Sequence, residues 1–238
     1  MGTPQLVTPP QDIAESMPSV DQLVTALERS TRTVGPVLYR AAYSPDGVLP
    51  DRVWNPYRFG PPKALIAVDG TSPFGWLYLA PEPETTVWEA RFARNDERCP
   101  GTFYLNGDAE RNGLIATVTF PRALRVWDLG APASSLLGIY DQLSSPDYEW
   151  PQWFGVRLHQ AMQQVDPAQR PDGAWYPSRR YRGQGAIILS FEALVPLRAG
   201  ITFTTTPFVE HPTYARLLAD PLRGEPPEQT VRRADLRL

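Results

Sequence analysis

The stretch GWLYLAPEPETTVWEARF, residues 75–92, carries Glu89 among large apolar side chains. If its second half is helical, Thr85 and Thr86 lie one turn before Glu89 and Phe92 lies about one turn after it, on the same face. A carboxylate held beside small hydroxyls and an aromatic ring could stabilise positive charge that develops on a bound substrate.

The same spacing allows a second interpretation, in which Glu89 is a surface residue. Arg91 and Arg94 follow it closely enough to form ion pairs across the helix. Spacing alone does not decide between a functional carboxylate and a solvated one.

Two arginines could bind an anion. In VLYRAA, strand alternation places Leu38 and Arg40 on one face, and an arginine beside a core leucine calls for an anionic partner. Arg58 lies in NPYRFGPP, where turns on both sides could hold the guanidinium at the mouth of a site; an ordinary loop ion pair is the alternative. Either guanidinium could bind two phosphate oxygens at once.

Other polar groups lie in or beside predicted strands. Tyr78, in the middle of GWLYLA, is either a core residue or a surface against which a ligand packs. Ser178 follows Pro177 at a strand end, where hydroxyls usually close turns. Tyr39 lies on the strand face opposite Arg40.

Several kinds of chemistry have no support in the sequence. With two histidines, His159 and His211, far apart and one cysteine, Cys99, a zinc site is not expected, and we predict no metal. The motifs of serine hydrolases, P-loop NTPases and Rossmann folds are missing, and RGQGAI reads as a turn. We expect a structural role for His159 within a helix.

Composition narrows the class of protein further. The net charge of -3 with interspersed signs argues against a nucleic-acid coat protein. The N-terminus lacks the features of a cleaved export signal, and no apolar run is long enough to span a bilayer. The expectation is a cytoplasmic protein without a membrane segment.

Helices and strands mix without regular βαβ alternation, which favours an α+β fold. Ser19 is a predicted N-cap with Gln22 three residues later, and Trp150, Phe154 and Leu158 begin an apolar helical stripe. Helices are predicted at residues 19–30, 81–94, 133–143 and 150–165. Strands are predicted at residues 36–42, 75–80, 113–120, 123–129, 173–178, 186–194 and 201–208, with a long ordered loop at residues 43–64.

The motifs LYR, RFGPP, GWLYLAPEPETTVWEARF, VWDLG and GAWYPSRR occur in this order, and together they resemble the RES-domain family, named for an Arg, a Glu and a Ser. The resemblance extends over about residues 36–195. We therefore predict an N-terminal helical arm at residues 1–35 and a RES domain with a C-terminal extension at residues 36–238.

The resemblance implies an ADP-ribosyltransferase-like split β-sheet with surrounding helices. It also implies an NAD-degrading toxin of a toxin–antitoxin pair, which cleaves the nicotinamide–ribose bond with water or inorganic phosphate as acceptor. NAD would be the substrate, and no cofactor is implied. The expected partner is an antitoxin with an Xre-type helix-turn-helix domain; direct nucleic-acid binding is not expected, and a homodimer within that complex stays open.

The resemblance implies catalytic roles for Glu89, Arg40 and Ser178, and substrate-binding roles for Arg58, Tyr78 and Tyr39. Glu89 would act near the ribose, and Arg40 and Arg58 would hold the pyrophosphate. Ser178 would either bind the carboxamide or steady Glu89.

Three alternatives remain. The same pocket could transfer ADP-ribose to a protein or small molecule, or the chain could be a catalytically silent module that binds an antitoxin. The third alternative is a tryptophan-rich carbohydrate-binding or scaffold domain.

Overall fold

The computed structural model describes residues 8–53, 55–130, 132–181 and 183–227. Its described strands form a five-stranded sheet in the order β1-β7-β8-β9-β3, a three-stranded sheet in the order β10-β6-β2, and the separate pair β4-β5. The strands are β1 (Thr31–Val34), β2 (Val37–Ala42), β3 (Trp76–Leu79), β4 (Ala93–Asn95), β5 (Phe103–Leu105), β6 (Leu114–Thr119), β7 (Leu124–Asp128), β8 (Gly173–Pro177), β9 (Gly185–Ser190) and β10 (Thr202–Pro207).

Within the sheets, β7 and β8 run parallel and the other pairs are antiparallel. An isolated bridge joins the two larger sheets: Tyr39 N donates to Ala80 O at 2.8 Å, and Ala80 N donates to Tyr39 O at 2.9 Å. The β-structure is therefore split, and with helices packed around it the predicted α+β fold is confirmed.

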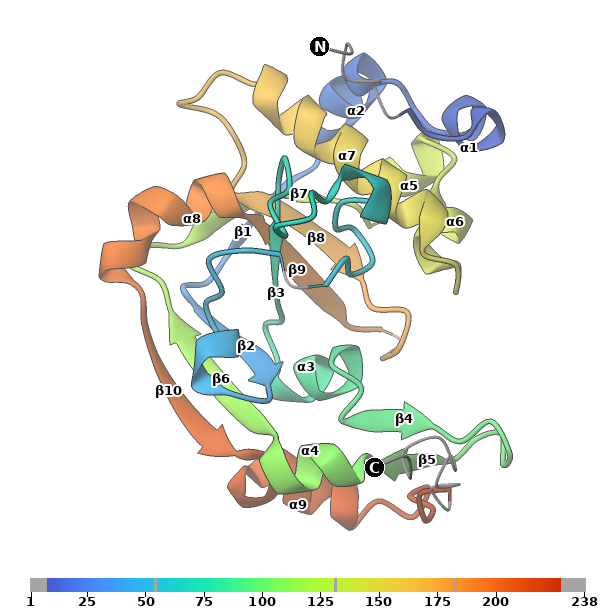
Figure 1. Cartoon of the computed structure of the whole chain (residues 1–238), viewed down its shortest axis with the longest axis vertical. Helices are drawn as coiled ribbons and strands as arrows, with labels where there is room; N and C mark the ends of the chain where they lie inside the picture. Colours follow the sequence, from blue (N-terminus) through green and yellow to red (C-terminus); the bar gives the residue numbers. More distant parts are fainter. Residues whose placement is uncertain (1–7, 54, 131, 182, 228–238) are drawn as a thin grey trace.

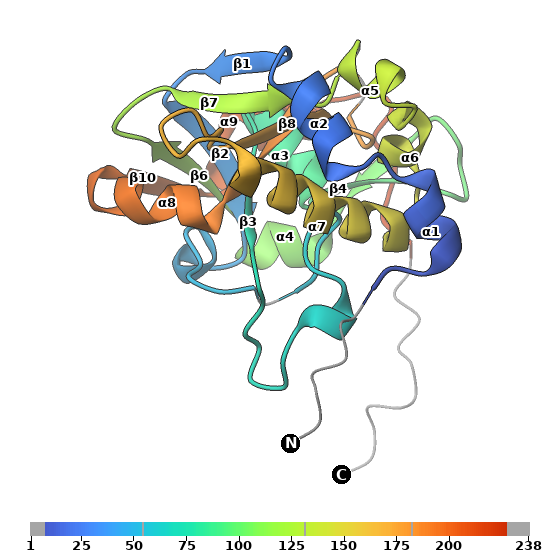
Figure 2. The same ribbon diagram turned by 90° about the horizontal axis from the view of Figure 1, so that it is seen from above.

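The helices gather at both ends of the sheets (Figure 1). Helices α1, α2, α5, α6 and α7 lie together at one end, whereas α4 and α9 lie at the other with β4 and β5 (Figure 1). Seen from above, along the line that joins the two ends, α7 lies in front of α4 (Figure 2). The α-helices are α1 (Gln11–Ser16), α2 (Val20–Leu27), α3 (Pro83–Glu89), α4 (Gly107–Asn112), α5 (Ala133–Leu136), α6 (Tyr140–Ser144), α7 (Glu149–Gln164), α8 (Phe191–Leu197) and α9 (Pro212–Leu218), and the 3-10 helices are η1 (Pro45–Gly47), η2 (Lys63–Leu65), η3 (Arg198–Gly200) and η4 (Phe208–Glu210).

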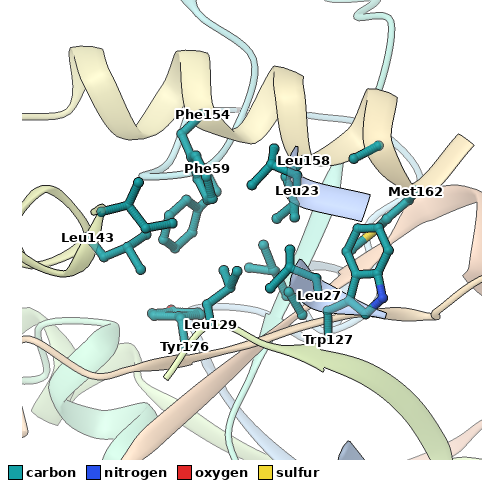
Figure 3. Packing of buried hydrophobic residues seen from close by; sticks show 14 of the residues in the cluster. Leu23, Leu27, Phe59, Trp127, Leu129, Leu143, Phe154, Leu158, Met162 and Tyr176 are labelled. Carbon is teal, nitrogen blue, oxygen red and sulfur yellow. The ribbon is translucent and has the colours of Figure 1, made fainter. Parts of the chain in front are cut away.

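Helices α2 and α7 form as their sequence patterns predict. Ser19 caps α2 in a capping box with Gln22, in which each side chain bonds the other residue's backbone N–H. The predicted stripe of α7 is buried and packs with α2 over the five-stranded sheet (Figure 3). Residues 8–35, within the predicted N-terminal arm, supply Leu23 and Leu27 to this cluster.

Two further apolar clusters fix the remaining elements. The second lies where the two larger sheets and α8 meet, and Leu38, Val118 and Ile187 are fully buried in it. The third surrounds α3 through Val87 and Trp88 and reaches β5 and η4. Strand β2 and helix α3 are thereby held between the two ends of the molecule.

Three predicted boundaries are wrong. The helix predicted at residues 81–94 ends at Glu89, because Arg91 has a positive φ of 63° and the chain then enters β4. The helix predicted at residues 133–143 is interrupted at Gly138, whose φ of 67° separates α5 from α6.

The third concerns the strand predicted at residues 186–194, which ends at Ser190 because its side chain caps α8 by accepting from Ala193 N. Strands β1, β4 and β5 and helices α1, α4 and α9 were not predicted. Part of the predicted C-terminal extension, residues 228–238, lies outside the described residues, as do residues 1–7 of the predicted arm.

Candidate active site

The carboxylate of Glu89 accepts two hydrogen bonds from side chains of one distant segment. Ser178 Oγ donates to Oε1 at 2.6 Å, and the Tyr176 hydroxyl donates to Oε2 at 3.0 Å. Both donors are buried, whereas Glu89 is half-buried. Among the described residues, the alternative ion pairs of Glu89 with Arg91 or Arg94 are not formed.

Helix α3 delivers Glu89 to these donors from a fixed position. Pro83 starts the helix, where its missing N–H costs no hydrogen bond. Thr86 is buried, and its Oγ1 accepts a 2.6 Å hydrogen bond from Ala41 N of β2. This bond ties the middle of α3 to the three-stranded sheet, so that its last residue, Glu89, faces the end of β8.

The early end of α3 changes what surrounds Glu89. Phe92 N donates to Val87 O at 2.9 Å as the helix closes. The prediction that Phe92 lies one helical turn beyond Glu89 is therefore wrong. Phe92 is instead fully buried in the third cluster. Glu89 is left at the helix end, where side chains from other segments can reach it.

Ser178 closes a turn and also holds Glu89. Its Oγ accepts from Tyr181 N at 3.0 Å and from Arg180 N at 3.3 Å, as expected of a hydroxyl after a strand. The same oxygen donates its proton to Glu89, which leaves no second proton for a substrate carboxamide. This geometry favours the predicted role of steadying Glu89.

Tyr176 was not predicted as a site residue. Burial first, and then the charge of Glu89, raise its pKa well above the ordinary value, so the hydroxyl keeps its proton and donates. Its ring meets Phe59 edge-on, with centroids 5.0 Å apart, in the cluster that Figure 3 shows. Since alternate residues of a strand share a face, the two-residue spacing from Ser178 was the available signal.

Tyr78 links Arg40 to the loop that carries Arg58. The Tyr78 hydroxyl accepts from Phe59 N at 2.8 Å, and its backbone carbonyl accepts from Arg40 Nη1 at 2.7 Å. Burial is the main cause that raises the Tyr78 pKa; Glu89 raises it further, whereas Arg58 lowers it. Tyr78 therefore lies within electrostatic range of the carboxylate.

Arg40 is bound to backbone carbonyls. Besides the Tyr78 bond, its Nε donates to Gly47 O at 2.9 Å, and burial lowers its pKa. The predicted anionic partner is not found among the described residues. Tyr39 forms the backbone bridge between the sheets, and its half-buried side chain packs against the third cluster.

Arg58 is buried and holds the end of α6. Its Nη1 donates to Ser145 O at 3.0 Å, and its Nη2 donates to Leu143 O. Its Nε is buried without a hydrogen-bond partner among the described residues. Burial first, and then the charge of Arg179, lower the Arg58 pKa to about 10, while Glu89 is among the groups that raise it.

Further cations beside Glu89 were not predicted. Arg180 Nη1 lies 3.4 Å from the Glu89 backbone carbonyl, and Arg179 Nη1 donates to Ser145 O at 3.0 Å. Tyr148, the residue before α7, receives hydrogen bonds from both arginines. The adjacent pair in GAWYPSRR was the sequence signal for these arginines. The site therefore combines one carboxylate with several guanidinium groups.

His159 has the predicted structural role. Its ring stacks on Phe74 with centroids 5.0 Å apart, and its Nε2 lies 3.1 Å from a Glu192 carboxylate oxygen. No group of potential metal ligands occurs among the described residues. In that same part of the chain, every helix is too short or too polar to cross a membrane.

A cavity of about 630 Å³ lies on the face of α3 that carries Glu84 and Trp88. Glu89 does not line it. Two of its carboxylates already have partners, since Asp96 binds Arg98 and Glu84 accepts from Tyr181. The hydrogen-bond donors and the guanidinium groups described above converge on Glu89 and not on this cavity.

Comparison with known proteins gives one family. A protein-family model described as RES domain matches residues 38–215 of the 238-residue chain. Among curated proteins and among solved structures, none matches significantly. The match includes Glu89, Ser178 and the arginines around them.

Proposed function

The chain belongs to the RES-domain family, which is known from toxin–antitoxin systems, and on that premise we propose that it is an enzyme that cleaves the nicotinamide–ribose bond of NAD. The observation that carries the proposal is the Glu89 carboxylate, oriented by Ser178 and Tyr176 and faced by guanidinium groups. An enzyme acting on NAD needs both features, because the bond breaks at a ribose and the substrate carries a diphosphate.

The bond to be broken suits a site without an acid. Cleavage passes through an oxocarbenium-like state, as glycoside cleavage does. Nicotinamide leaves as a neutral molecule from a positively charged ring, so no group needs to protonate it. This agrees with a candidate site in which the described residues place no histidine against Glu89.

Glu89 would stabilise the positive charge that develops at the anomeric carbon and accept a hydrogen bond from a ribose hydroxyl. Two donors on separate oxygens fix the carboxylate in one orientation before substrate binds. Such preorganisation avoids a reorganisation cost during the reaction. Ser178 and Tyr176 are therefore positioning residues, and Glu89 is the catalytic residue.

The remaining residues would hold the substrate. Tyr78 would pack against the nicotinamide or its ribose, and Tyr39 would belong to the wall of the pocket. Arg40 and Arg58 would draw the diphosphate towards the site by their charge, although their hydrogen bonds go to backbone carbonyls. An antitoxin with an Xre-type helix-turn-helix domain is the proposed partner, since a chain that destroys NAD must be restrained in its own cell.

The test is product analysis. Purified chain is incubated with NAD, with and without inorganic phosphate, and the products are separated by chromatography. Nicotinamide with free ADP-ribose would identify hydrolysis, and a phosphate-dependent product would identify phosphorolysis. Nicotinamide released only when an added protein or small molecule becomes labelled would replace the proposal by ADP-ribosyl transfer, and no release under any condition would refute it.

A further inference from the structure

Four arginines from three separate segments lie around Glu89 without a carboxylate partner. None of them has an ion pair within 4.0 Å in the described part of the chain. The four are Arg58 in the loop before η2, Arg91 after α3, and Arg179 and Arg180 after β8. In a chain whose net charge is -3, this group concentrates positive charge at one place.

Uncharged oxygens connect three of these guanidinium groups. The Ser145 carbonyl accepts from Arg58 and from Arg179, each at 3.0 Å. The Tyr148 hydroxyl accepts from Arg180 at 3.1 Å and from Arg179 at 3.5 Å. A carbonyl and a phenol satisfy hydrogen bonds but do not neutralise the charges that they bring together.

The resulting field shows in the pKa values of the group. Burial lowers the pKa of Arg180, and the charge of Arg91 lowers it further. Burial alone would raise the pKa of the Tyr148 phenol, but Arg180, Arg91 and Arg179 together bring it below its ordinary value. These arginines therefore repel one another and favour an anion among them.

The arginines differ in how freely they could receive that anion. Arg58 is 6% exposed, and both terminal nitrogens bind carbonyls at the end of α6. Arg179 and Arg180 are only half-buried, and the oxygen between them belongs to Tyr148, an exposed side chain. A phosphate could bind beside that phenol, accept from both guanidinium groups, each of which can donate to two oxygens, and accept the hydroxyl proton of Tyr148.

We infer that Arg179, Arg180 and Tyr148 form a phosphoryl-binding subsite next to Glu89, which receives either the diphosphate of NAD or free inorganic phosphate. That the bound group is the diphosphate of NAD rests on the proposed function, whereas the binding of inorganic phosphate does not. The subsite adjoins Glu89, because Arg180 Nη1 lies 3.4 Å from the Glu89 backbone carbonyl oxygen.

A binding measurement tests the subsite without any assumption about activity. Inorganic pyrophosphate and inorganic phosphate are titrated calorimetrically into wild type, Arg179→Gln, Arg180→Gln and the control Arg111→Gln, whose ion pair lies within α4. We expect binding to wild type and the control, and a loss of about ten-fold or more in affinity in each site variant. Equal affinities in all four proteins, or no binding to wild type, would overturn the inference.

A kinetic measurement then identifies the source of the phosphate. NAD and nicotinamide riboside, which has no phosphate, are compared as substrates of the same variants. A higher KM for NAD with unchanged riboside kinetics identifies the diphosphate, and a higher phosphate requirement with unchanged KM for NAD identifies free phosphate. Equal losses on both substrates, with unchanged pyrophosphate binding and melting temperature, would contradict the subsite. If wild type cleaves neither substrate, the proposed function fails and the calorimetry still decides the subsite.

Discussion

Replacement of Ser178 by alanine separates the positioning of Glu89 from the binding of substrate. The change removes the 2.6 Å hydrogen bond to Glu89 Oε1 and leaves the Tyr176 bond to Oε2 in place. It also takes the acceptor away from the Arg180 and Tyr181 amides. The carboxylate is then held by one donor and can rotate away from the ribose.

The structure sets the expected size of the effect. A hydrogen bond to a charged group contributes about 1.5–3 kcal/mol, and about 1.4 kcal/mol corresponds to ten-fold in rate. We expect kcat for NAD cleavage to fall by about 10- to 150-fold, towards the lower end because Tyr176 still holds Glu89. The two amides that lose their acceptor should lower the free energy of unfolding by about 1–2 kcal/mol.

The assay is nicotinamide release at varied NAD, with urea denaturation of the same samples. Because Ser178 is buried and bonds Glu89, the loss should fall on kcat while KM stays within a few-fold of wild type. Ser134→Ala is the matched control, since Ser134 Oγ is buried with no hydrogen-bond partner in the described part of the chain. A Ser178→Ala enzyme with wild-type kcat, or with only KM changed, would refute this reasoning.

Three further predictions concern the frame of the site. Gly155→Ala should lower the free energy of unfolding by about 1–3 kcal/mol, because the added Cβ would clash with the Phe59 backbone carbonyl; an unchanged denaturation midpoint would contradict this close approach. In Tyr148→Phe the loss of stability relative to wild type should be larger near pH 10 than at neutral pH. A phenol whose pKa is lowered in the folded protein stabilises the fold at pH values above its pKa in the unfolded chain, and this stabilisation is lost as the pH falls through the pKa of the folded protein. A difference in the free energy of unfolding that does not change with pH would argue against this prediction. Ser19→Ala should cost about 1 kcal/mol by removing the cap of α2, with NAD turnover unchanged, and a variant as stable as wild type in thermal melting would exclude the capping role.

Local patterns predicted much of the framework. The capping box at Ser19 and the stripe from Trp150 to Val165 are short-range features, and both helices form where these features occur. The motif around Glu89 and Ser178 identified the two side chains that the fold brings together. Spacing alone does not predict that Ser178 contacts Glu89; the resemblance to the RES-domain family is what suggested it.

The rest depends on contacts between distant segments. The end of α3 follows from one positive φ at Arg91, which no periodicity reveals. Arg58 reaches the Leu143 carbonyl at the end of α6 across 85 positions of the chain. The arginine expected at the mouth of a site or in a loop ion pair therefore has backbone partners. Tyr148 meets Arg180 only after α7 and β8 have packed. A local sequence pattern does not predict such contacts between distant segments.

The most direct measurement of the central claim is nicotinamide release from NAD by wild type, Glu89→Gln and Glu110→Gln. Glu110 on α4 accepts a tyrosine hydroxyl, as Glu89 does, and so provides a matched control away from the site. We predict a loss of about 100-fold or more in kcat for Glu89→Gln, in a protein that still unfolds cooperatively although the amide cannot accept from both Ser178 and Tyr176, and wild-type activity for Glu110→Gln. A folded Glu89→Gln protein that releases nicotinamide at the wild-type rate would contradict the account.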